Sequence, residues 1–110
     1  MAQQKNKLFK IDMLVLAVLY HSDEYGYEIS KKIRELTDDN INLKDGVLYP
    51  ILYKLLQDKS ISSYEKQVGR KIRVYYHIEE YGKQVLFEMI NDYRKMLNNI
   101  EIIIGEIKDE

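Results

Sequence analysis

The sequence predicts a mainly α-helical fold that carries one β-hairpin and ends in a long helix. Three observations predict it. Apolar residues recur at helical spacing over most of the 110 residues, two β-rich runs flank a glycine, and the C-terminal segment holds a heptad pattern. One proline and five glycines are too few for a turn-rich all-β fold. The length suits one domain with a modest core.

Composition narrows the class of protein. Hydrophobic residues make up 45% and charged residues 32%, which is typical of a globular chain rather than a disordered one. Without cysteine there is no disulfide framework and no thiolate metal site. The longest apolar run, residues 13–20, is far shorter than the roughly 20 residues of a membrane span. No signal-peptide layout precedes it. These features predict a cytoplasmic protein without a membrane partner.

Two helices are predicted in the first third of the chain. Residues 8–20 are nearly all apolar after Asp12, so this helix must contact more than one partner. Residues 21–24 form a break. A second helix opens at residues 25–27 and buries one stripe made of Ile29, Ile33 and Leu36, before turn-favouring residues 37–40 end it. The polar residues 1–7 bring Lys5 and Lys7 within reach of any phosphate backbone.

Residues 43–56 predict a third helix with two contrasting faces. Its buried face is expected to contain Leu48, Ile51, Leu52, Leu55 and Leu56. The opposite face carries long, polar-tipped side chains, namely Lys44, Asp45, Tyr49, Tyr53 and Lys54. Pro50 lies inside the pattern, where a proline normally removes a backbone hydrogen bond, and we interpret it as shaping the first turn.

A β-hairpin is predicted after this helix. Residues 61–66 and 71–78 are β-rich and flank the glycine-containing loop 67–70. In the second run the side chains alternate with period two, so one face should point inward and the other outward. The inward set is Ile72, Val74, Tyr76 and Ile78, and the outward set is Lys71, Arg73, Tyr75 and His77.

The C-terminal segment predicts a long helix with a heptad seam. The seam consists of Leu86, Ile90, Tyr93, Leu97, Ile100, Ile104 and Ile107, and Met89, Met96 and Ile103 flank it. A chain of this size offers no obvious internal partner for such a seam. We therefore predict a homodimer with two-fold symmetry. The alternative is a long helix that lies across its own small core.

The order of elements is helix, helix, turn, helix, β-hairpin, long helix, which is the winged helix-turn-helix arrangement. In that arrangement the second helix of the helix-turn-helix enters the major groove of DNA, and the hairpin lies beside it as a wing. Residues 44–77 hold seven basic and three acidic side chains, a local balance that attracts a polyanion. On charge alone, a solvated mixed-charge surface explains the pattern equally well.

Five stretches resemble the PadR family of bacterial transcriptional regulators. Y-G-Y-E-I at 25–29 is similar to the family's H-G-Y-E-I, and G-V-L-Y-P-I-L at 46–52 to its G-T-L-Y-P-A-L recognition helix. G-R-K at 69–71 and Y-Y-H-I at 75–78 resemble the wing motifs G-R-x and Y-Y-x-L. E-E-Y-G at 79–82 resembles T-x-x-G, with Glu79 in place of the capping threonine. Ser60 also replaces a family glycine after the recognition helix.

The resemblance implies a homodimeric repressor that binds an inverted repeat in double-stranded DNA and dimerises through its first and last helices. Its targets would be stress, detoxification or efflux genes, and a small aromatic effector would release the DNA. Residues 1–78 would form the winged helix-turn-helix domain, whose N-terminal helix also contacts the dimer partner, and residues 79–110 the dimerisation helix.

Each function has candidate residues. The DNA-binding candidates are Tyr27, Lys44, Gly46, Tyr49, Tyr53, Lys54, Arg70, Lys71 and Arg73. The seam named above is the candidate dimer interface. The candidate effector contacts are Met89, Tyr93 and Met96, because methionines are deformable and a tyrosine ring can stack on a flat ligand; the alternative for Tyr93 is a bulky core residue.

Other functions receive less support from the sequence. His21 and His77 have no companions at metal-ligand spacing, and no residues are spaced as a nucleophile and its base. We therefore expect neither an enzyme nor a metal or cofactor site. The alternative function is a winged-helix module that binds another protein through its exposed tyrosines and long helix, without specific DNA binding.

Overall fold

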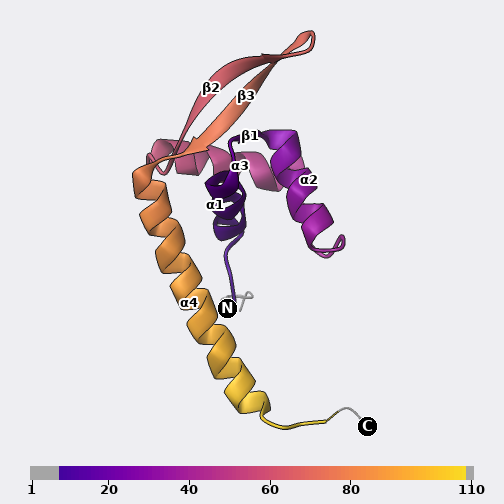
Figure 1. Cartoon of the computed structure of the whole chain (residues 1–110), viewed down its shortest axis with the longest axis vertical. Coiled ribbons are helices and arrows are strands. Elements are labelled where there is room, and N and C mark those ends of the chain that lie inside the picture. Colours follow the sequence, from indigo (N-terminus) through magenta and orange to yellow (C-terminus); the bar gives the residue numbers. More distant parts are fainter. Residues whose placement is uncertain (1–7, 109–110) are drawn as a thin grey trace, which may run out of the picture.

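The computed structural model describes residues 8–108. Lys5 and Lys7, which the sequence analysis places within reach of a phosphate backbone, lie outside the described residues. The elements follow one another as α1 (Ile11–His21), β1 (Glu24–Tyr25), α2 (Gly26–Leu36), α3 (Asp45–Gln57), β2 (Ile61–Val68), β3 (Lys71–Ile78) and α4 (Glu80–Ile104). Figure 1 shows α1 among the other helices and the β2–β3 hairpin at one end of the molecule. The predicted winged helix-turn-helix fold with a long C-terminal helix is confirmed.

The core forms around α1, because every other helix packs part of its apolar surface against the same cluster. The fully buried apolar side chains are Val15, Leu16 and Leu19 of α1, Ile29 of α2, Leu48, Leu52 and Leu55 of α3, and Leu86 of α4. This arrangement explains why α1 is apolar on more than one face. Ile51 and Leu56 of the predicted α3 face are only half-buried.

The sheet has three antiparallel strands in the order β1-β3-β2. In the hairpin, Ile61 pairs with Ile78 at the base and Val68 pairs with Lys71 at the tip. Gly69 takes the left-handed conformation in the turn, with φ +62°. Strand β1 was not predicted from the sequence. It contains two residues, Glu24 and Tyr25, which are too few to show a periodic pattern.

The predicted inward face of β3 is buried only in its second half. Tyr76 and Ile78 are buried, whereas Ile72 is 66% exposed and Val74 is 43% exposed. The inward prediction was therefore wrong for Ile72 and Val74. The hairpin extends past the helices, so that its outer half has no layer to pack against (Figure 1).

The buried stripe of α2 ends one turn earlier than predicted. Ile29 and Ile33 are buried, but Leu36 is 81% exposed, so its assignment to the core was wrong. Thr37 ends the helix: its Oγ1 donates to the Ile33 carbonyl at 2.7 Å and accepts from the Ile41 backbone N–H at 3.1 Å. Thr37 therefore connects the end of α2 to the segment that leads into α3.

The junction between α3 and α4 accounts for the two departures from the family motifs. Lys59, not residue 60, takes the left-handed conformation, with φ 65°. Ser60 is fully buried, and its carbonyl accepts from the Glu79 backbone N–H at 2.9 Å. Gly82 packs so closely on that carbonyl that a Cβ at this position would overlap the oxygen. Helix α4 starts without a side-chain cap, and the Glu79 carboxylate instead accepts from Ser62 Oγ at 2.6 Å.

Helix α4 joins the core only near its start. Leu86 is buried in the core of its own protomer, and Ile90 and Tyr93 pack partly against that core, so the first half of the heptad seam serves the chain itself. The assignment of Leu86 to a dimer interface was therefore wrong.

The helix ends at Ile104, and Gly105 follows with φ +63°. Ile107 consequently lies beyond the helix, which corrects the predicted seam and the predicted end of the helix.

The second half of α4 projects away from the rest of the protomer (Figure 1). Leu97 and Ile104 are 37% and 43% exposed, respectively. Within residues 8–108, no helix combines the length and apolar character that crossing a membrane requires.

Candidate nucleic-acid interface

The start of α3 is the exposed end of the predicted reading helix. Lys44 occupies the N-cap position, and Lys44, Asp45, Gly46 and Val47 are all exposed. A Cβ added at Gly46 would meet no heavy atom within 4 Å. Tyr27, in the first turn of α2, is 57% exposed. The first turn of α3 and the Tyr27 side chain of α2 are thus open to solvent.

Tyr49 differs from the prediction, because it is half-buried rather than exposed on the polar face of α3. Its hydroxyl lies against Gly26 at the start of α2, where a Cβ would overlap the oxygen and would lie 2.9 Å from Cζ. Burial raises the pKa of the Tyr49 phenol; Asp45 and Tyr53 add to this effect, while Arg73 opposes it. Tyr49 therefore joins the starts of α2 and α3, within electrostatic range of the wing.

Replacing Gly26 with alanine is expected to lower the free energy of unfolding by about 1–2 kcal/mol, because the new methyl group must displace the Tyr49 ring. The ring is the end of a side chain and can swing outward, so the protein should still fold. Adding Tyr49→Phe removes the closest atom and should restore part of the loss. Urea unfolding of the single and double variants measures both effects. Additive losses would contradict the contact.

The wing carries cations in two different settings. Arg70 and Lys71 are exposed at the tip, beside the Gly69 turn. Arg73 is half-buried, and its guanidinium carbon lies 4.9 Å from the centroid of the Tyr25 ring. Among the described residues, no carboxylate lies within ion-pair distance of Arg73, so its charge stays available to an anion.

Aromatic rings pack against one another on the outward face of the sheet, edge to face between Tyr25 and Tyr75 and stacked between Tyr75 and Tyr64. The Tyr25 and Tyr75 ring centroids are 5.4 Å apart, and those of Tyr75 and Tyr64 are 5.8 Å apart. Lys66 Nζ lies 5.0 Å from the centroid of the Tyr75 ring. These residues form one row across β1, β3 and β2, because Tyr25 pairs with Tyr75 and Tyr75 pairs with Tyr64.

Asp23 ties the segment before α2 to the hairpin. It accepts a hydrogen bond from the Tyr64 hydroxyl at 2.7 Å and lies 2.8 Å from His77 Nδ1. Partial burial alone would raise the pKa of the Asp23 carboxyl, but the hydrogen bonds with His77 and Tyr64 outweigh it, so that the pKa is lowered. The ionised carboxylate is therefore the form that the folded wing favours.

Because its pKa is lowered in the folded state, Asp23 contributes stability above the ordinary value of 3.8, and this contribution is lost as the pH falls through the folded value. Asp23→Asn should therefore lose less stability than wild type between about pH 5 and pH 2. Urea midpoints at each pH measure this difference. Glu88→Gln, which removes an exposed carboxylate from α4, is the matched control. An unchanged acid sensitivity in Asp23→Asn would contradict the role of Asp23.

Lys54, unlike the other predicted DNA contacts, forms an ion pair within the protomer. Its Nζ donates to Asp12 Oδ2 of α1 at 2.7 Å, and this hydrogen bond raises the pKa of the Lys54 ammonium. The ion pair joins α3 to α1 and neutralises the charge locally. Tyr53, by contrast, is 62% exposed, with its ring centroid 6.4 Å from that of Tyr49.

The structure therefore groups most of the predicted site residues but not all of them. Gly46, Tyr49 and Tyr53 share α3, with Lys44 at its N-cap and Arg73 within electrostatic range of Tyr49. Arg70 and Lys71 form a separate group at the wing tip, and Lys54 is directed toward α1. The sequence interpretation missed two contacts, namely Gly26 with Tyr49 and Tyr25 with Arg73. In the sequence, the Y-G-Y triplet at residues 25–27 was the only feature that pointed to these two contacts.

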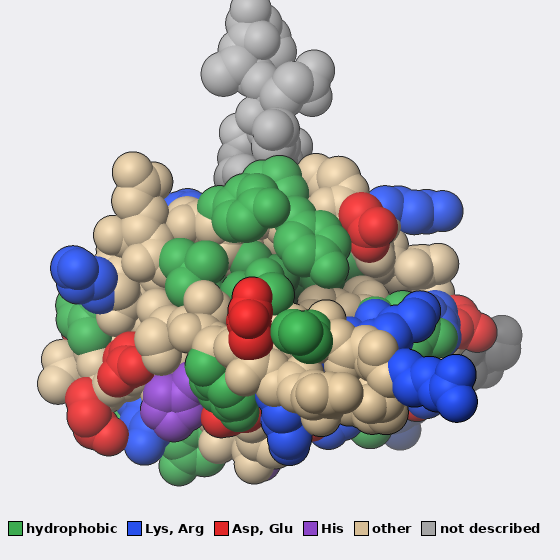
Figure 2. Space-filling view, turned by 90° about the horizontal axis from the view of Figure 1, so that it is seen from above, with side chains coloured by type: hydrophobic (Ala, Val, Ile, Leu, Met, Phe, Trp, Pro, Cys, Tyr) green, Lys and Arg blue, Asp and Glu red, His purple; other side chains and the backbone are tan. Residues whose placement is uncertain are grey.

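Figure 2 shows the wing end of the molecule from above. Lysine and arginine side chains lie around its edges, and hydrophobic side chains, a class that includes tyrosine, gather toward the middle. Acidic side chains are interspersed among them. A polyanion would therefore be held by individually placed cations rather than by a uniformly basic surface.

The three predicted effector contacts line one small depression between α4 and the segment around the start of α1. Met89, Tyr93 and Met96 border it, together with Leu8, Phe9, Lys10, Met13 and Asp92. Its volume is about 230 Å³. Tyr93 also packs partly against the core, in agreement with its alternative interpretation as a core residue. Across residues 8–108, no group of three or more histidine, aspartate or glutamate side chains is arranged to hold a metal ion.

Comparison with known proteins places the chain in a family. Residues 15–88 match the transcriptional regulator PadR-like family. A PadR family transcription regulator from Clostridium difficile R20291 is 31% identical, with a TM-score of 0.77 over 86% of this chain and 98% of that chain. Bacillus subtilis PadR, solved in complex with operator DNA, is 25% identical, with a TM-score of 0.66. The match covers 73% of this chain and 46% of that chain.

One relative has a named role. Transcriptional regulator YqjI of Escherichia coli (strain K12) is 33% identical over 79 residues, which are 72% of this chain and 37% of that protein. The matched region of this chain, residues 15–88, includes the helix-turn-helix, the wing and the start of α4. The chain belongs to the PadR-like family of transcriptional regulators.

Proposed function

We propose that the protein is a homodimeric, sequence-specific DNA-binding repressor of transcription. One observation carries the proposal: the exposed start of α3 lies beside the first turn of α2, where Tyr49 packs on Gly26, and Arg73 of the wing is within electrostatic range of Tyr49. Helix α3 fits the major groove, which is about 12 Å wide. As a regulator of transcription, the protein would act in the cytoplasm.

Different residues would have different roles on DNA. Lys44, the exposed backbone at Gly46 and the Tyr53 hydroxyl are placed to contact base edges or phosphates from α3. Tyr27 would position the first turn of α2 on a phosphate. Arg70 and Lys71 would bind phosphates or reach the minor groove from the wing tip, with Arg73 behind them. Tyr49 would act through its packing on Gly26, and Lys54 by bracing α3 on α1.

Dimerisation is supported by the apolar surface that the second half of α4 leaves uncovered. Leu97, Ile103 and Ile104 are 37%, 82% and 43% exposed in the protomer. A two-fold axis near α4 and α1 would cover them and would set the spacing of the two α3 helices. Half-sites of an inverted repeat then lie one helical turn, about 34 Å, or a multiple of it apart.

The proposal includes an aromatic effector that binds beside Tyr93. The depression beside Tyr93 has a volume of about 230 Å³, below the range of roughly 300–1,000 Å³ that holds drug-sized ligands. A second protomer would have to complete it. We expect flat phenolic or cationic compounds that bind there to lower the affinity for DNA. We also expect the target genes to encode stress, detoxification or efflux functions.

The proposal is tested with DNA. Footprinting on the region upstream of the protein's own gene, together with selection from random duplexes, should return a two-fold symmetric site whose binding weakens as salt rises. Light scattering of the same sample should report a dimer. If neither method finds binding above the non-specific level, the repressor proposal fails. Recovery of a stoichiometric protein partner without any DNA shift would favour the protein-interaction alternative.

A further inference from the structure

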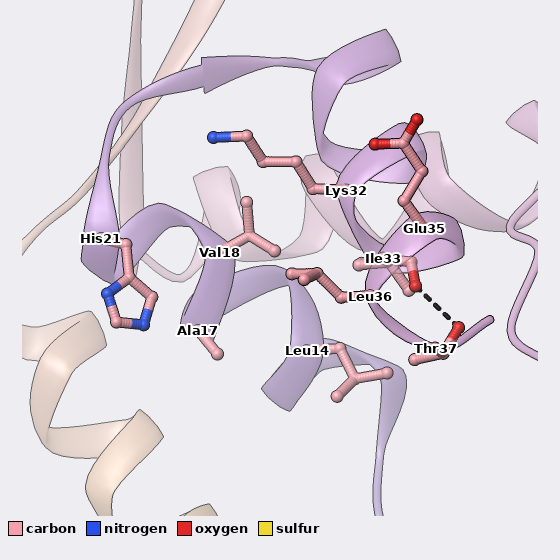
Figure 3. A pocket seen from close by; sticks show the side chains of 9 residues that line it. All are labelled: Leu14, Ala17, Val18, His21, Lys32, Ile33, Glu35, Leu36 and Thr37. Atoms are coloured by element: carbon pink, nitrogen blue, oxygen red, sulfur yellow. Dashed lines mark hydrogen bonds between the residues drawn. The ribbon is translucent and has the colours of Figure 1, made fainter.

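Several half-buried cations of the protomer are held in place by carboxylates. Lys32, which borders the pocket between α1 and α2 (Figure 3), pairs with Glu24. Arg34, also on α2, has its Nε 3.7 Å from Asp39 Oδ1. Such a pair fixes the position of the cation, but the carboxylate also cancels the charge that a phosphate would otherwise feel.

Arg73 of β3 is held in a different way. Its guanidinium carbon lies 4.9 Å from the centroid of the Tyr25 ring, and no carboxylate of the described residues lies within ion-pair distance. An aromatic ring attracts a cation through its quadrupole but carries no net charge of its own. The contact therefore restricts the guanidinium group while its full positive charge stays available to an anion.

The register of the sheet brings the ring and the guanidinium group together. Tyr25 pairs directly with Tyr75, and Arg73 precedes Tyr75 by two residues. The side chains of Tyr25 and Arg73 are therefore diagonal neighbours on one face of the sheet, a separation that long side chains bridge. The Tyr75 ring packs edge to face against Tyr25, with the centroids 5.4 Å apart. The ring that faces Arg73 is thus fixed by strand pairing and by a second ring.

Arg73 has hydrogen-bond donors that the protomer does not use. Among the described residues, Nε is buried without a partner, and it is the only nitrogen of Arg73 in that condition. The two outer nitrogens are therefore the donors that a ligand would meet. Arg73 also lies within electrostatic range of Tyr49, which packs on Gly26 at the start of α2. Its guanidinium group thus lies where the wing, α2 and α3 come together.

We propose that Tyr25 positions Arg73 to bind a phosphate of the DNA backbone at this junction. The inference rests on the proposed function and adds a positioning residue to it, because Tyr25 acts through Arg73. A guanidinium group binds a phosphate through two parallel hydrogen bonds, which require a defined orientation of its plane. The Tyr25 ring supplies that orientation without neutralising the charge.

The salt dependence of DNA binding tests this role. Arg73→Gln removes one phosphate contact from each protomer, so in a dimer the slope of log K against log salt should become shallower by about two. Tyr25→Leu removes no charge, yet it should make the slope shallower by about one, because a released guanidinium group leaves the phosphate for part of the time. The affinity at moderate salt should fall about threefold to tenfold. In the Arg73→Gln background, Tyr25→Leu should cause no further loss.

Two control variants separate positioning from a general loss of wing stability. Tyr25→Phe keeps the ring and should retain the wild-type slope, with an affinity within about twofold of wild type. Tyr64→Leu removes a ring from the other end of the same row, on β2. It should lower the urea midpoint but leave the slope unchanged. A shallower slope in Tyr64→Leu would mean that wing stability, and not the ring beside Arg73, controls the phosphate contact.

A second measurement preserves the shape of the side chain at position 25. Phenylalanine with an increasing number of ring fluorines in place of Tyr25 weakens the negative face of the ring with little change in its size. DNA affinity should fall stepwise along this series when Arg73 is present and stay constant in the Arg73→Gln background. A flat series in the presence of Arg73 would overturn the inference, even if Tyr25→Leu failed to fold.

The outcomes distinguish this inference from the repressor proposal, because slopes can be measured on a random duplex as well as on an operator. If an operator is found and Tyr25→Leu keeps the wild-type slope, Tyr25 does not position Arg73 and the repressor proposal stands. If the slope changes on a random duplex but no operator is found, the positioning role holds and the repressor proposal fails. A protein that binds no duplex at all would overturn both.

Discussion

Replacing Gly82 with alanine is expected to lower the free energy of unfolding by about 3 kcal/mol, which corresponds to a fall in Tm of about 10–20 °C. The new Cβ would overlap the carbonyl oxygen of Ser60 and would lie 3.0 Å from Ile78 Cγ1. That oxygen belongs to a fully buried residue and already accepts the Glu79 N–H, so it has no room to move. Thermal and urea unfolding measure the loss.

Gly46→Ala is the matched control for this prediction. Gly46 also lies in the first turn of a helix, but a Cβ there meets nothing within 4 Å. Because alanine favours the helix over glycine, this variant should gain about 0.5–1 kcal/mol. The same methyl group should weaken DNA binding if the backbone approaches DNA at this turn. A Gly82→Ala protein as stable as wild type would show that the α3–α4 junction is looser than we describe.

Removing both tip cations with Arg70→Ala and Lys71→Ala is expected to weaken operator binding by about tenfold or more at moderate salt. Each cation that neutralises a phosphate contributes about 0.9 to the slope of log K against log salt. The two replacements remove four cations from a dimer, so the slope should become shallower by about three to four. The fold should be unaffected because both side chains are exposed. Gel-shift titrations at four or more salt concentrations measure affinity and slope together.

Arg94→Ala with Lys95→Ala removes the same charge from exposed positions on α4. We expect this control to retain the wild-type slope, provided that light scattering shows an unchanged oligomeric state. If the control and the wing variant lose affinity equally, net charge rather than wing contact explains the effect. An unchanged slope in the wing variant would remove Arg70 and Lys71 from the phosphate contacts.

The sequence predicted the order and type of the main elements, because each carries a long periodic signal. Burial of one face produces a periodic pattern that the sequence shows directly. This is the case for Tyr76 and Ile78 in the strand and for Leu48, Leu52 and Leu55 in the helix, all of which are buried. Periodicity does not identify the surface against which a stripe packs. Leu86 matched a coiled-coil seam but packs inside its own protomer, and Leu36 continued the stripe of α2 past the edge of the core.

The candidate site was predictable as a set of residue types but not as a set of contacts. The exposure of Arg70 and Lys71 followed from a glycine turn, which is a local feature. The pairing of Lys54 with Asp12 joins residues 42 positions apart, and the packing of Tyr49 on Gly26 depends on the angle between two helices. Such contacts arise from tertiary packing, which leaves no short-range pattern in one sequence.

The two-residue strand β1 has a consequence for the thermodynamics of binding. Glu24 and Tyr25 pair with Tyr76 and Tyr75, and Asp23 bonds to both strands of the hairpin, so the wing is held to the start of α2. A hairpin held in this way has lost much of its conformational entropy before it meets a ligand. In the proposed DNA complex, association would then cost less ordering of the wing, and preorganisation rather than induced fit would provide selectivity.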